Sequence, residues 1–331
     1  MTAEKSERRE QEILKPEELF RTIDEVRRDA PPLEPLWGDF LFKKAVTSIV
    51  GDPGIGKTGL GYGLASALCL QQPFLGIEPE EVINALYLDF ESADPLISSR
   101  ANYIIGEKEI PNLYIYNDIR FFLNQIAKIT IDICHEKFIN LLIIDNQTSA
   151  FNTRDENDNS EAARQMRFVR QITNACNTAT LIFHHTSKSN LPGIRKGTGA
   201  FARARLADVC INIDYPDEEH SEIIRWQVPK NRLVDSQPLW YIKKTGGTFD
   251  FTDPPLGVVG RTRVNTIIYK VQQEILALLN NGQQYKRKDI LEILSQFEPR
   301  MVDEGLDRLK RLGRLEMPQY GFYKARKVKC L

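Results

Sequence analysis

The segment 51–58 carries the residues that are best suited to bind an anion. It reads Gly51-Asp52-Pro53-Gly54-Ile55-Gly56-Lys57-Thr58. This order fits the pattern G-x-x-x-x-G-K-[S/T] at every fixed position. Glycines let backbone N–H groups turn toward phosphate oxygens, and a helix that begins at Lys57 presents its positive end to the same anion. The pattern therefore predicts binding of ATP and Mg²⁺, with Lys57 at the β- and γ-phosphates, Thr58 at the metal and Gly59 beside the nucleotide.

A glycine-rich turn that matched this pattern by chance would lack the elements that the motif requires on either side. The apolar run Val46–Val50 precedes the loop and predicts a buried strand. The segment Gly59–Leu70 follows the loop and has helical character. A strand, a phosphate loop and a helix in this order favour nucleotide binding over a chance turn.

Two further apolar runs end in carboxylates. Leu141–Ile144 is followed by Asp145, which we expect to hold Mg²⁺ because the carboxyl ends of parallel strands face the ligand. An aspartate that only caps a turn is the alternative. The run Ala85–Phe90 leads to Glu91, which we expect to be the base that orients the attacking water. Asp89 is the competing candidate for that role.

Two adjacent histidines, His184 and His185, follow the apolar run Thr180–Phe183. Neighbouring residues on a strand point to opposite faces, so the pair is poorly placed to bind one metal ion. We expect one histidine to lie near the γ-phosphate and the other to be structural.

Short apolar runs alternate with helical segments through the middle of the chain. The predicted strands are Val46–Val50, Ala85–Phe90, Leu113–Tyr116, Leu141–Ile144, Thr180–Phe183, Val209–Ile213 and Ile223–Val228. The predicted helices are Gly59–Leu70, Pro95–Ile105, Ile119–Lys137 and Ser160–Asn174. This alternation predicts an α/β fold with a mostly parallel sheet covered by helices on both faces. Later runs, Leu239–Lys243 and Thr248–Phe251, predict antiparallel strands.

The two ends of the chain differ from this middle part. We predict a charged arm over residues 1–32 with a helix at Glu17–Arg28, then an ATPase domain over residues 33–253. A small domain over residues 262–331 follows. Its predicted helices are Thr266–Leu279, Tyr285–Gln296 and Met301–Leu312, and its short strands are 313–317 and 321–324. Three helices and a hairpin predict a winged helix-turn-helix.

Composition and charge exclude several classes of protein. No run approaches the ~18–20 apolar residues of a membrane span, and the charged N-terminus lacks the apolar region of a secretory signal. Five scattered cysteines without a Cys-x-x-Cys pair indicate reduced thiols in a cytoplasmic protein and disfavour a zinc site. Residues 261–331 carry 15 lysines and arginines against eight acids, which hints at a polyanionic partner.

In their order, these residues resemble the RecA-like superfamily and, within it, the plasmid RepA-type hexameric helicases, with DnaB-type helicases further away. The resemblance covers roughly residues 33–250. It rests on the phosphate loop, on the strand ends at Glu91 and Asp145, and on three later segments. These are His184-His185-Thr186-Ser187-Lys188, Lys196-Gly197-Thr198-Gly199-Ala200 with Ala207-Asp208-Val209, and Pro229-Lys230-Asn231-Arg232.

The resemblance implies a homo-oligomer, a hexameric ring with ATP between neighbouring subunits. It implies that Glu91 is the catalytic carboxylate, Asp145 the Mg²⁺-site acid and His185 the γ-phosphate sensor. Lys230 and Arg232 match the pair that reaches the neighbour's site, where a guanidinium can be worth about 10³–10⁵ in rate. A solvated hairpin pair is the alternative, and three other residues compete for the role: Arg195, Arg203 and Arg205.

Two loops of such a ring would face a channel for single-stranded DNA. The loop Ser187–Lys196 is basic and suits a nucleic-acid backbone through Lys188, Arg195 and Lys196. The loop Phe151–Ser160 is acidic, which disfavours processive unwinding. In the C-terminal domain three cations could contact duplex phosphates, although many winged helices contact proteins instead. They are Lys286, Arg287 and Lys288.

We therefore expect a nucleic-acid-dependent ring ATPase that acts as a replicative DNA helicase of a mobile element. The alternative is a switch in which ATP controls assembly on DNA or on a partner without unwinding, and the acidic loop favours it. A small-molecule kinase is disfavoured because the sequence gives no sign of a lid or an acceptor pocket.

Overall fold

The chain divides into two compact units, residues 1–34 and 35–331. The computed structural model describes residues 20–153, 158–185, 206–216, 220–235, 239–252, 263–279, 281–311, 315–319 and 321–325. In its described part, the first unit contains helix α2 (Ile23–Asp29), none of whose residues is buried. Thr22 caps this helix, since its hydroxyl accepts the Glu25 N–H at 3.2 Å while the Glu25 carboxylate accepts the Thr22 N–H at 2.7 Å. This capping box corrects the predicted helix Glu17–Arg28, because Phe20 and Arg21 precede the cap.

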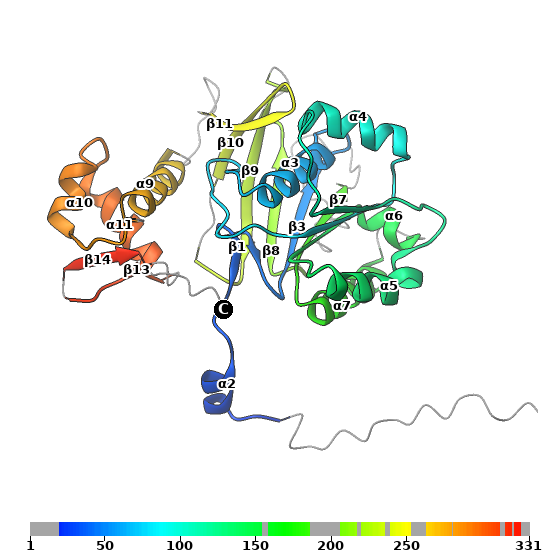
Figure 1. Cartoon of the computed structure of the whole chain (residues 1–331), viewed down its shortest axis with the longest axis horizontal. Helices are drawn as coiled ribbons and strands as arrows, with labels where there is room; N and C mark the ends of the chain where they lie inside the picture. The colour runs from blue at the N-terminus through cyan, green and yellow to red at the C-terminus, as the bar shows by residue number, and fades with distance from the viewer. Residues whose placement is uncertain are drawn as a thin grey trace, which may run out of the picture. The chain divides into compact units, whose positions relative to one another are not determined.

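The described part of the second unit contains a nine-stranded sheet of order β11-β10-β9-β8-β3-β7-β6-β4-β5 (Figure 1). Its parallel strands are β3 (Val46–Gly51), β4 (Ala85–Asp89), β5 (Leu113–Tyr116), β6 (Leu141–Asp145), β7 (Ala179–His185) and β8 (Val209–Asp214). The antiparallel strands are β9 (Ile223–Asn231), β10 (Leu239–Thr245) and β11 (Thr248–Thr252). The predicted α/β fold with a mostly parallel sheet is confirmed.

Helices cover both faces of this sheet. Helices α3 (Lys57–Cys69) and α4 (Asp94–Ile104) pack on one face, and α5 (Leu123–Glu136) and α7 (Asn159–Cys176) lie side by side on the other (Figure 1). The alternation along β6 accounts for the two layers. Ile143 belongs to the core beneath α3, whereas Ile144 belongs to the core beneath α5 and α7. The sheet is therefore buried on both sides, as its continuous apolar strands require.

Helix α3 packs against the side chain of Phe183 on β7 at Gly61. A Cβ atom added to Gly61 would lie 2.8 Å from the Phe183 ring, so a larger residue here would force the ring to shift. Because α3 begins at Lys57, the close packing fixes the helix N-terminus against the end of the sheet. That position is where the phosphate loop must hold its ligand.

Some predicted boundaries are wrong, and some short elements were not predicted. Helix α5 begins at Leu123 instead of Ile119, because Phe122 provides the cap by donating its N–H to the Gln125 side chain at 2.8 Å. Strands β1 (Pro35–Trp37) and β2 (Leu41–Phe42) and helix α6 (Gln147–Phe151) are too short to give a periodic signal.

No helix in the described part of the chain is long and apolar enough to cross a membrane.

The C-terminal residues form a small group of helices and strands with a core of their own. The elements are α9 (Arg263–Leu279), β12 (Tyr285–Lys286), α10 (Arg287–Ile293), α11 (Pro299–Arg311), β13 (Leu315–Glu316) and β14 (Phe322–Ala325). Where they are described, the strands pair antiparallel in the order β12-β14-β13. The predicted helix Tyr285–Gln296 is corrected, since its first two residues join the sheet and α10 ends at Ile293. The winged helix-turn-helix and the division into three domains stay predictions.

Candidate active site

The phosphate loop connects β3 to α3 and is shaped by glycines. Gly54 and Gly56 have φ values of 80° and 107°, a region that residues with a Cβ atom rarely adopt. Lys57 is 4 % exposed, and its Nζ donates to the carbonyl oxygens of Gly51 at 2.8 Å and Asp52 at 2.9 Å. These bonds hold the ammonium group across the loop at the N-terminus of α3.

Burial lowers the pKa of Lys57 to about 8, against the opposing influence of Asp145, Asp52 and Glu91. The ammonium group therefore remains largely protonated at neutral pH. Among the described residues no carboxylate forms an ion pair with Lys57, and such a buried cation is well suited to receive an anionic ligand.

Asp145 ends β6 and lies beside the loop. It is 3 % exposed, and it accepts a hydrogen bond from the Tyr87 hydroxyl at 2.7 Å. Burial raises the pKa of Asp145 to about 6, while hydrogen bonds with Tyr87 and Thr58 oppose the rise. The Thr58 hydroxyl and the Asp145 carboxylate thus form a pair of oxygen donors, which is the donor chemistry that Mg²⁺ prefers. The described residues contain no cluster of three or more acidic, histidine or cysteine side chains, so such an ion would take its other ligands from phosphate and water.

Glu91 follows β4 and is held by three side chains. Asn146 Nδ2 donates to Glu91 Oε1 at 2.5 Å, Ser149 Oγ donates to the same oxygen at 3.1 Å, and His185 Nε2 lies 3.8 Å away. The pKa of Glu91 falls to about 2, with the interaction with His185 as the largest cause and hydrogen bonds from Ser149 and Asn146 as further causes. Glu91 is therefore an ionised, partly exposed carboxylate, the form that a base must have.

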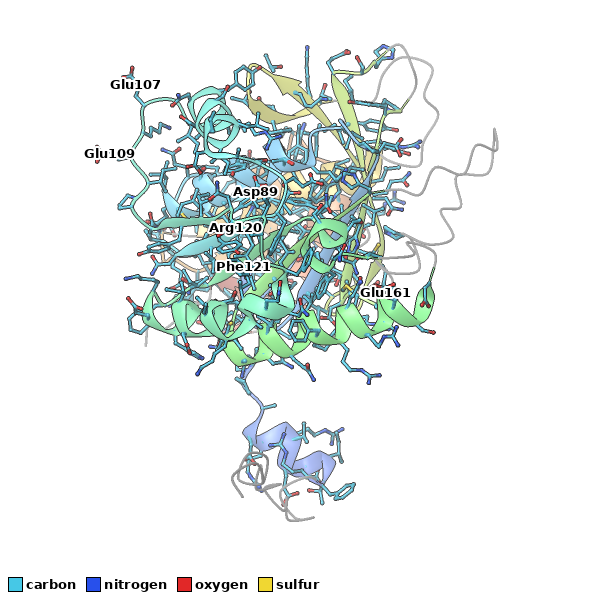
Figure 2. The ribbon with its side chains drawn as sticks, turned by 90° about the vertical axis from the view of Figure 1, so that its right-hand side faces the viewer. Asp89, Glu107, Glu109, Arg120, Phe121 and Glu161 are labelled. Atoms are coloured by element: carbon cyan, nitrogen blue, oxygen red, sulfur yellow. The ribbon has the colours of Figure 1, made fainter. Side chains whose placement is uncertain are left out.

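Asp89, the competing candidate, is occupied by other contacts. Its Oδ1 accepts the N–H groups of Glu91 at 3.0 Å and Ser92 at 2.9 Å. Its Oδ2 lies 3.4 Å from the Tyr62 hydroxyl and 3.9 Å from the Arg100 guanidinium. Asp89, labelled near the middle of the view in Figure 2, is only 1 % exposed. The geometry favours Glu91 as the base and makes Asp89 the residue that shapes the turn leading to it.

The two histidines have different surroundings. His185 Nδ1 lies 3.2 Å from Lys57 Nζ, and its Nε2 lies 2.8 Å from Asn146 Nδ2. His184 is 3 % exposed, and its Nε2 lies 3.1 Å from the hydroxyl of Ser48 on β3. The strand alternation thus places His185 in the site with Lys57 and puts His184 into the sheet interior.

Three side chains of the site were not predicted from the sequence. Asn146 and Ser149 hold Glu91, and Asn146 also caps α6, since its Oδ1 accepts the Ser149 N–H at 3.1 Å. A polar residue directly after the strand-end Asp145 was the available signal. Lys244 on β10 donates to the Ile55 carbonyl at 3.3 Å from a position 189 residues along the chain. No local pattern could have indicated that contact.

The residues predicted to act between subunits have unequal surroundings. Lys230 Nζ donates to the Ala207 carbonyl at 2.5 Å within its own chain. The Arg232 side chain is exposed, and its backbone N–H donates to the Asp208 carbonyl at 3.0 Å. The competing candidates Arg195, Arg203 and Arg205 lie outside the described residues.

The predicted DNA contacts are also unequal. The loop Ser187–Lys196, with Lys188, Arg195 and Lys196, lies outside the described residues. Arg287 makes a two-pronged ion pair with Asp303, both distances being 2.6 Å. Lys286 Nζ lies 5.4 Å from the centre of the Phe322 ring, and Lys288 is exposed. Of these three cations, Arg287 is the least available to a phosphate.

Comparison with known proteins agrees with this fold. The family model AAA_25, described as an AAA domain, matches residues 10–190, more than half of the 331-residue chain. The chain therefore belongs to this family of AAA-domain proteins, and its central part is a RecA-like P-loop ATPase domain. It is similar in structure to the KaiC-like protein PH0186 from the hyperthermophilic archaeon Pyrococcus horikoshii, with a TM-score of 0.50 and 12 % sequence identity over 66 % of this chain and 96 % of that one. At that identity the likeness concerns the fold alone. Among curated proteins, none matches the chain.

Proposed function

We propose that this ATPase forms a ring, is stimulated by nucleic acid and acts as a RepA-type replicative DNA helicase of a mobile element. The observation that carries the proposal is the convergence of Lys57, Glu91 and His185 at the carboxyl ends of neighbouring parallel strands. Each has the chemistry that phosphoryl transfer to water requires: a cation for the phosphates, a carboxylate for the water and a polar group between them.

The hydrolytic step follows from these contacts. The loop N–H groups and the Lys57 ammonium bind the phosphates of ATP. Thr58 and Asp145 would hold Mg²⁺, which would supply charge stabilisation at those phosphates. Glu91, ionised at neutral pH, orients a water for attack and accepts its proton. His185 contacts both Lys57 and the Asn146 amide that holds Glu91. Loss of the γ-phosphate at Lys57 can therefore change the position of Glu91 through His185 and Asn146.

The ring is supported by the exposed guanidinium of Arg232. An exposed guanidinium can complete the charge stabilisation in a neighbour's site. Lys230, which donates to the Ala207 carbonyl, is the weaker candidate for that role. We therefore expect Arg232→Ala to lower hydrolysis by about 10³-fold or more, while Lys230→Ala lowers it less. A mixed ring of Arg232→Ala and Glu91→Gln subunits should regain part of the activity, since some interfaces then contain both groups.

ATP turnover with and without single-stranded DNA, followed by unwinding of a forked duplex with either tail polarity, tests the helicase proposal. We expect strong stimulation by single-stranded DNA and strand separation that requires Glu91. Stimulated hydrolysis without unwinding of any fork would rule the helicase out and leave the ATPase intact.

A non-motor switch is the second candidate, and the charge pairs of the C-terminal module favour it. Arg287 is paired with Asp303 and Arg308 with Glu304, so two cations are already neutralised on the surface that α10 and α11 form. In the acidic loop, Asp158 caps α7 by accepting the N–H groups of Ser160 and Glu161. The switch predicts slow hydrolysis that is indifferent to DNA, with ATP-dependent assembly or partner binding. Stimulation of hydrolysis by several hundred-fold with single-stranded DNA would contradict it.

A further inference from the structure

We propose that two stacked tyrosines, Tyr62 and Tyr87, are positioning residues for the hydrolytic site, Tyr87 for the Mg²⁺-site carboxylate and Tyr62 for the turn that carries the base. The inference rests on the proposed ATP hydrolysis at this site. The motif residues identify the groups that meet the nucleotide, whereas these tyrosines lie behind those groups and determine where they point.

Tyr87 holds Asp145 from the neighbouring strand. Its hydroxyl donates to Asp145 Oδ2 at 2.7 Å, and the two residues are 0 % and 3 % exposed. Strands β4 and β6 pair with Asp89 opposite Asp145, so Tyr87 lies two residues back on the same face. One carboxylate oxygen is therefore fixed by a neutral donor, which orients the carboxylate toward Thr58.

Tyr62 holds the other strand end. Its hydroxyl donates to Asp89 Oδ2 at 3.4 Å, while Asp89 Oδ1 accepts the N–H groups of Glu91 and Ser92. Asp89 thereby shapes the turn from which Glu91 reaches Asn146. Tyr62 stands on α3, five residues after Lys57, so the helix that carries the phosphate-binding lysine also supports the base.

The two rings are packed as one unit. Their centroids are 4.4 Å apart with an interplanar angle of 20°, and a Cβ atom at Gly61 would lie 3.0 Å from the Tyr87 hydroxyl oxygen. A tyrosine hydroxyl has an ordinary pKa of about 10, so each of the two can act as a donor at neutral pH. Glycine at position 61 keeps the space that the pair requires.

The two hydrogen bonds predict separable effects. Tyr87→Phe keeps the stacked ring and removes only the donor to Asp145, so it should weaken the contribution of Mg²⁺ to nucleotide binding by about 10-fold or more. Its affinity for nucleotide in EDTA should equal that of the wild type. Tyr62→Phe should leave Mg²⁺-dependent binding unchanged and lower the hydrolysis rate at saturating MgATP by about 10-fold, because the turn before Glu91 is less well fixed.

The experiment measures the affinity of the full chain for a fluorescent, slowly hydrolysed ATP analogue, with Mg²⁺ and with EDTA, beside steady-state ATP turnover. Tyr116→Phe is the matched control, since its hydroxyl donates to the Asp118 carbonyl at 2.8 Å and to no carboxylate in the site. Thermal unfolding reports whether each variant is folded. If Tyr87→Phe does not fold, Tyr62→Phe still tests the inference, because its ATP turnover should fall while its Mg²⁺-dependent affinity for nucleotide stays unchanged.

A wild-type Mg²⁺ dependence in folded Tyr87→Phe would overturn the inference, and so would an equal loss of affinity and turnover in Tyr62→Phe. Such results would leave the wild-type ATPase intact. A wild-type chain that binds the analogue neither with Mg²⁺ nor in EDTA would instead remove the proposed function itself, and the two failures are therefore distinguishable.

Discussion

The polar groups at the carboxyl edge of the sheet and those of the C-terminal module are stabilised in different ways. At the sheet edge, Lys57, Asp89 and Asp145 are all less than 5 % exposed and bind backbone groups or tyrosine hydroxyls. In the C-terminal module, Arg287 and Asp303 have side chains 50 % and 37 % exposed and bind each other. The three groups at the sheet edge are buried with fixed partners, whereas Arg287 and Asp303 form a solvated ion pair.

This difference determines how much each region constrains its residues. A buried polar group without a partner costs about 1–3 kcal/mol, so every member of the sheet-edge network depends on its neighbours. An exposed ion pair contributes about 0–1 kcal/mol, so the charges of the module can change with little effect on folding. Substitutions should therefore affect activity and stability strongly in the first region and only weakly in the second.

The largest effect is expected for Glu91→Gln. Removing the base should lower ATP turnover by about 10²–10⁴-fold while ATP binding is retained, because the phosphate loop is untouched. Turnover and nucleotide affinity measured on the same preparation check this. A rate within a few-fold of the wild type would assign the base to another residue.

Glu91 also predicts a pH dependence of stability. The pKa of Glu91 in the folded protein is about 2, below the ordinary value of 4.5. Its contribution to the free energy of unfolding is therefore complete above about pH 4.5 and is lost as the pH falls toward 2. The stability difference between the wild type and Glu91→Gln should therefore narrow over this window, by a modest amount because the side chain is 43 % exposed. Thermal unfolding of both proteins from pH 5 to pH 2 measures the difference, and a gap that widens on acidification would contradict the contacts described.

Asn146→Ala should have the next largest effect, because one amide holds both Glu91 and His185. Misplacement of the base predicts a loss of about 10–100-fold in turnover with ATP affinity nearly unchanged. Ser149→Ala is the matched comparison. It removes one hydrogen bond to Glu91 and none to His185, so its loss should be smaller. An equal loss in both variants would mean that the contact with His185 has no catalytic value.

Asp89→Ala tests whether that residue supports structure instead of chemistry. The Tyr62 hydroxyl and the N–H groups of Glu91 and Ser92 lose their acceptor. This predicts destabilisation of roughly 1–3 kcal/mol and a lower melting temperature. Turnover should fall as the turn before Glu91 loosens, but by less than in Glu91→Gln. A variant as stable as the wild type and as inactive as Glu91→Gln would reverse the two roles.

The smallest effects are expected in the C-terminal module, where Arg287→Ala and Lys288→Ala form a matched pair. If the module binds duplex DNA, Lys288→Ala should weaken binding and reduce the slope of log affinity against log salt by about 1. Arg287→Ala should change binding less and stability by about 0.2–1 kcal/mol, because its partner is Asp303. Duplex binding measured over a range of salt concentrations checks both variants. Equal salt slopes in the two would show that Arg287 contacts DNA phosphate as readily as Lys288 does, despite its ion pair with Asp303.

The sequence predicted the site where backbone geometry restricts the choice of residue. The loop needs glycine at Gly54 and Gly56, and strand-end carboxylates at neighbouring parallel strands must meet at one edge, so Asp145 and Glu91 could be expected there. Lys244 could not be predicted, because its contact with the Ile55 carbonyl joins segments 189 residues apart and follows no local period. The position of Asn146 directly after Asp145 was a signal for a polar site residue, but its contacts with Glu91 and His185 could not be predicted. The choice between His184 and His185 needed the strand register, which places only His185 beside Lys57.

The charge count does not show which cations could meet a polyanionic partner. Residues 261–331 have more cations than acids, and Arg287 and Arg308 are among the cations that are paired with carboxylates of α11. Net charge does not reveal which cations are already paired, and that requires the positions of side chains on neighbouring helices.

The most direct test of the central claim, that this chain hydrolyses ATP at the loop 51–58, is ATP turnover by the wild type and Lys57→Ala. The exposed Lys128→Ala serves as a control for the loss of a lysine elsewhere. We expect measurable turnover in the wild type and Lys128→Ala, and a loss of about 10²–10³-fold in folded Lys57→Ala. Turnover that survives in Lys57→Ala would place the chemistry elsewhere and contradict the site described.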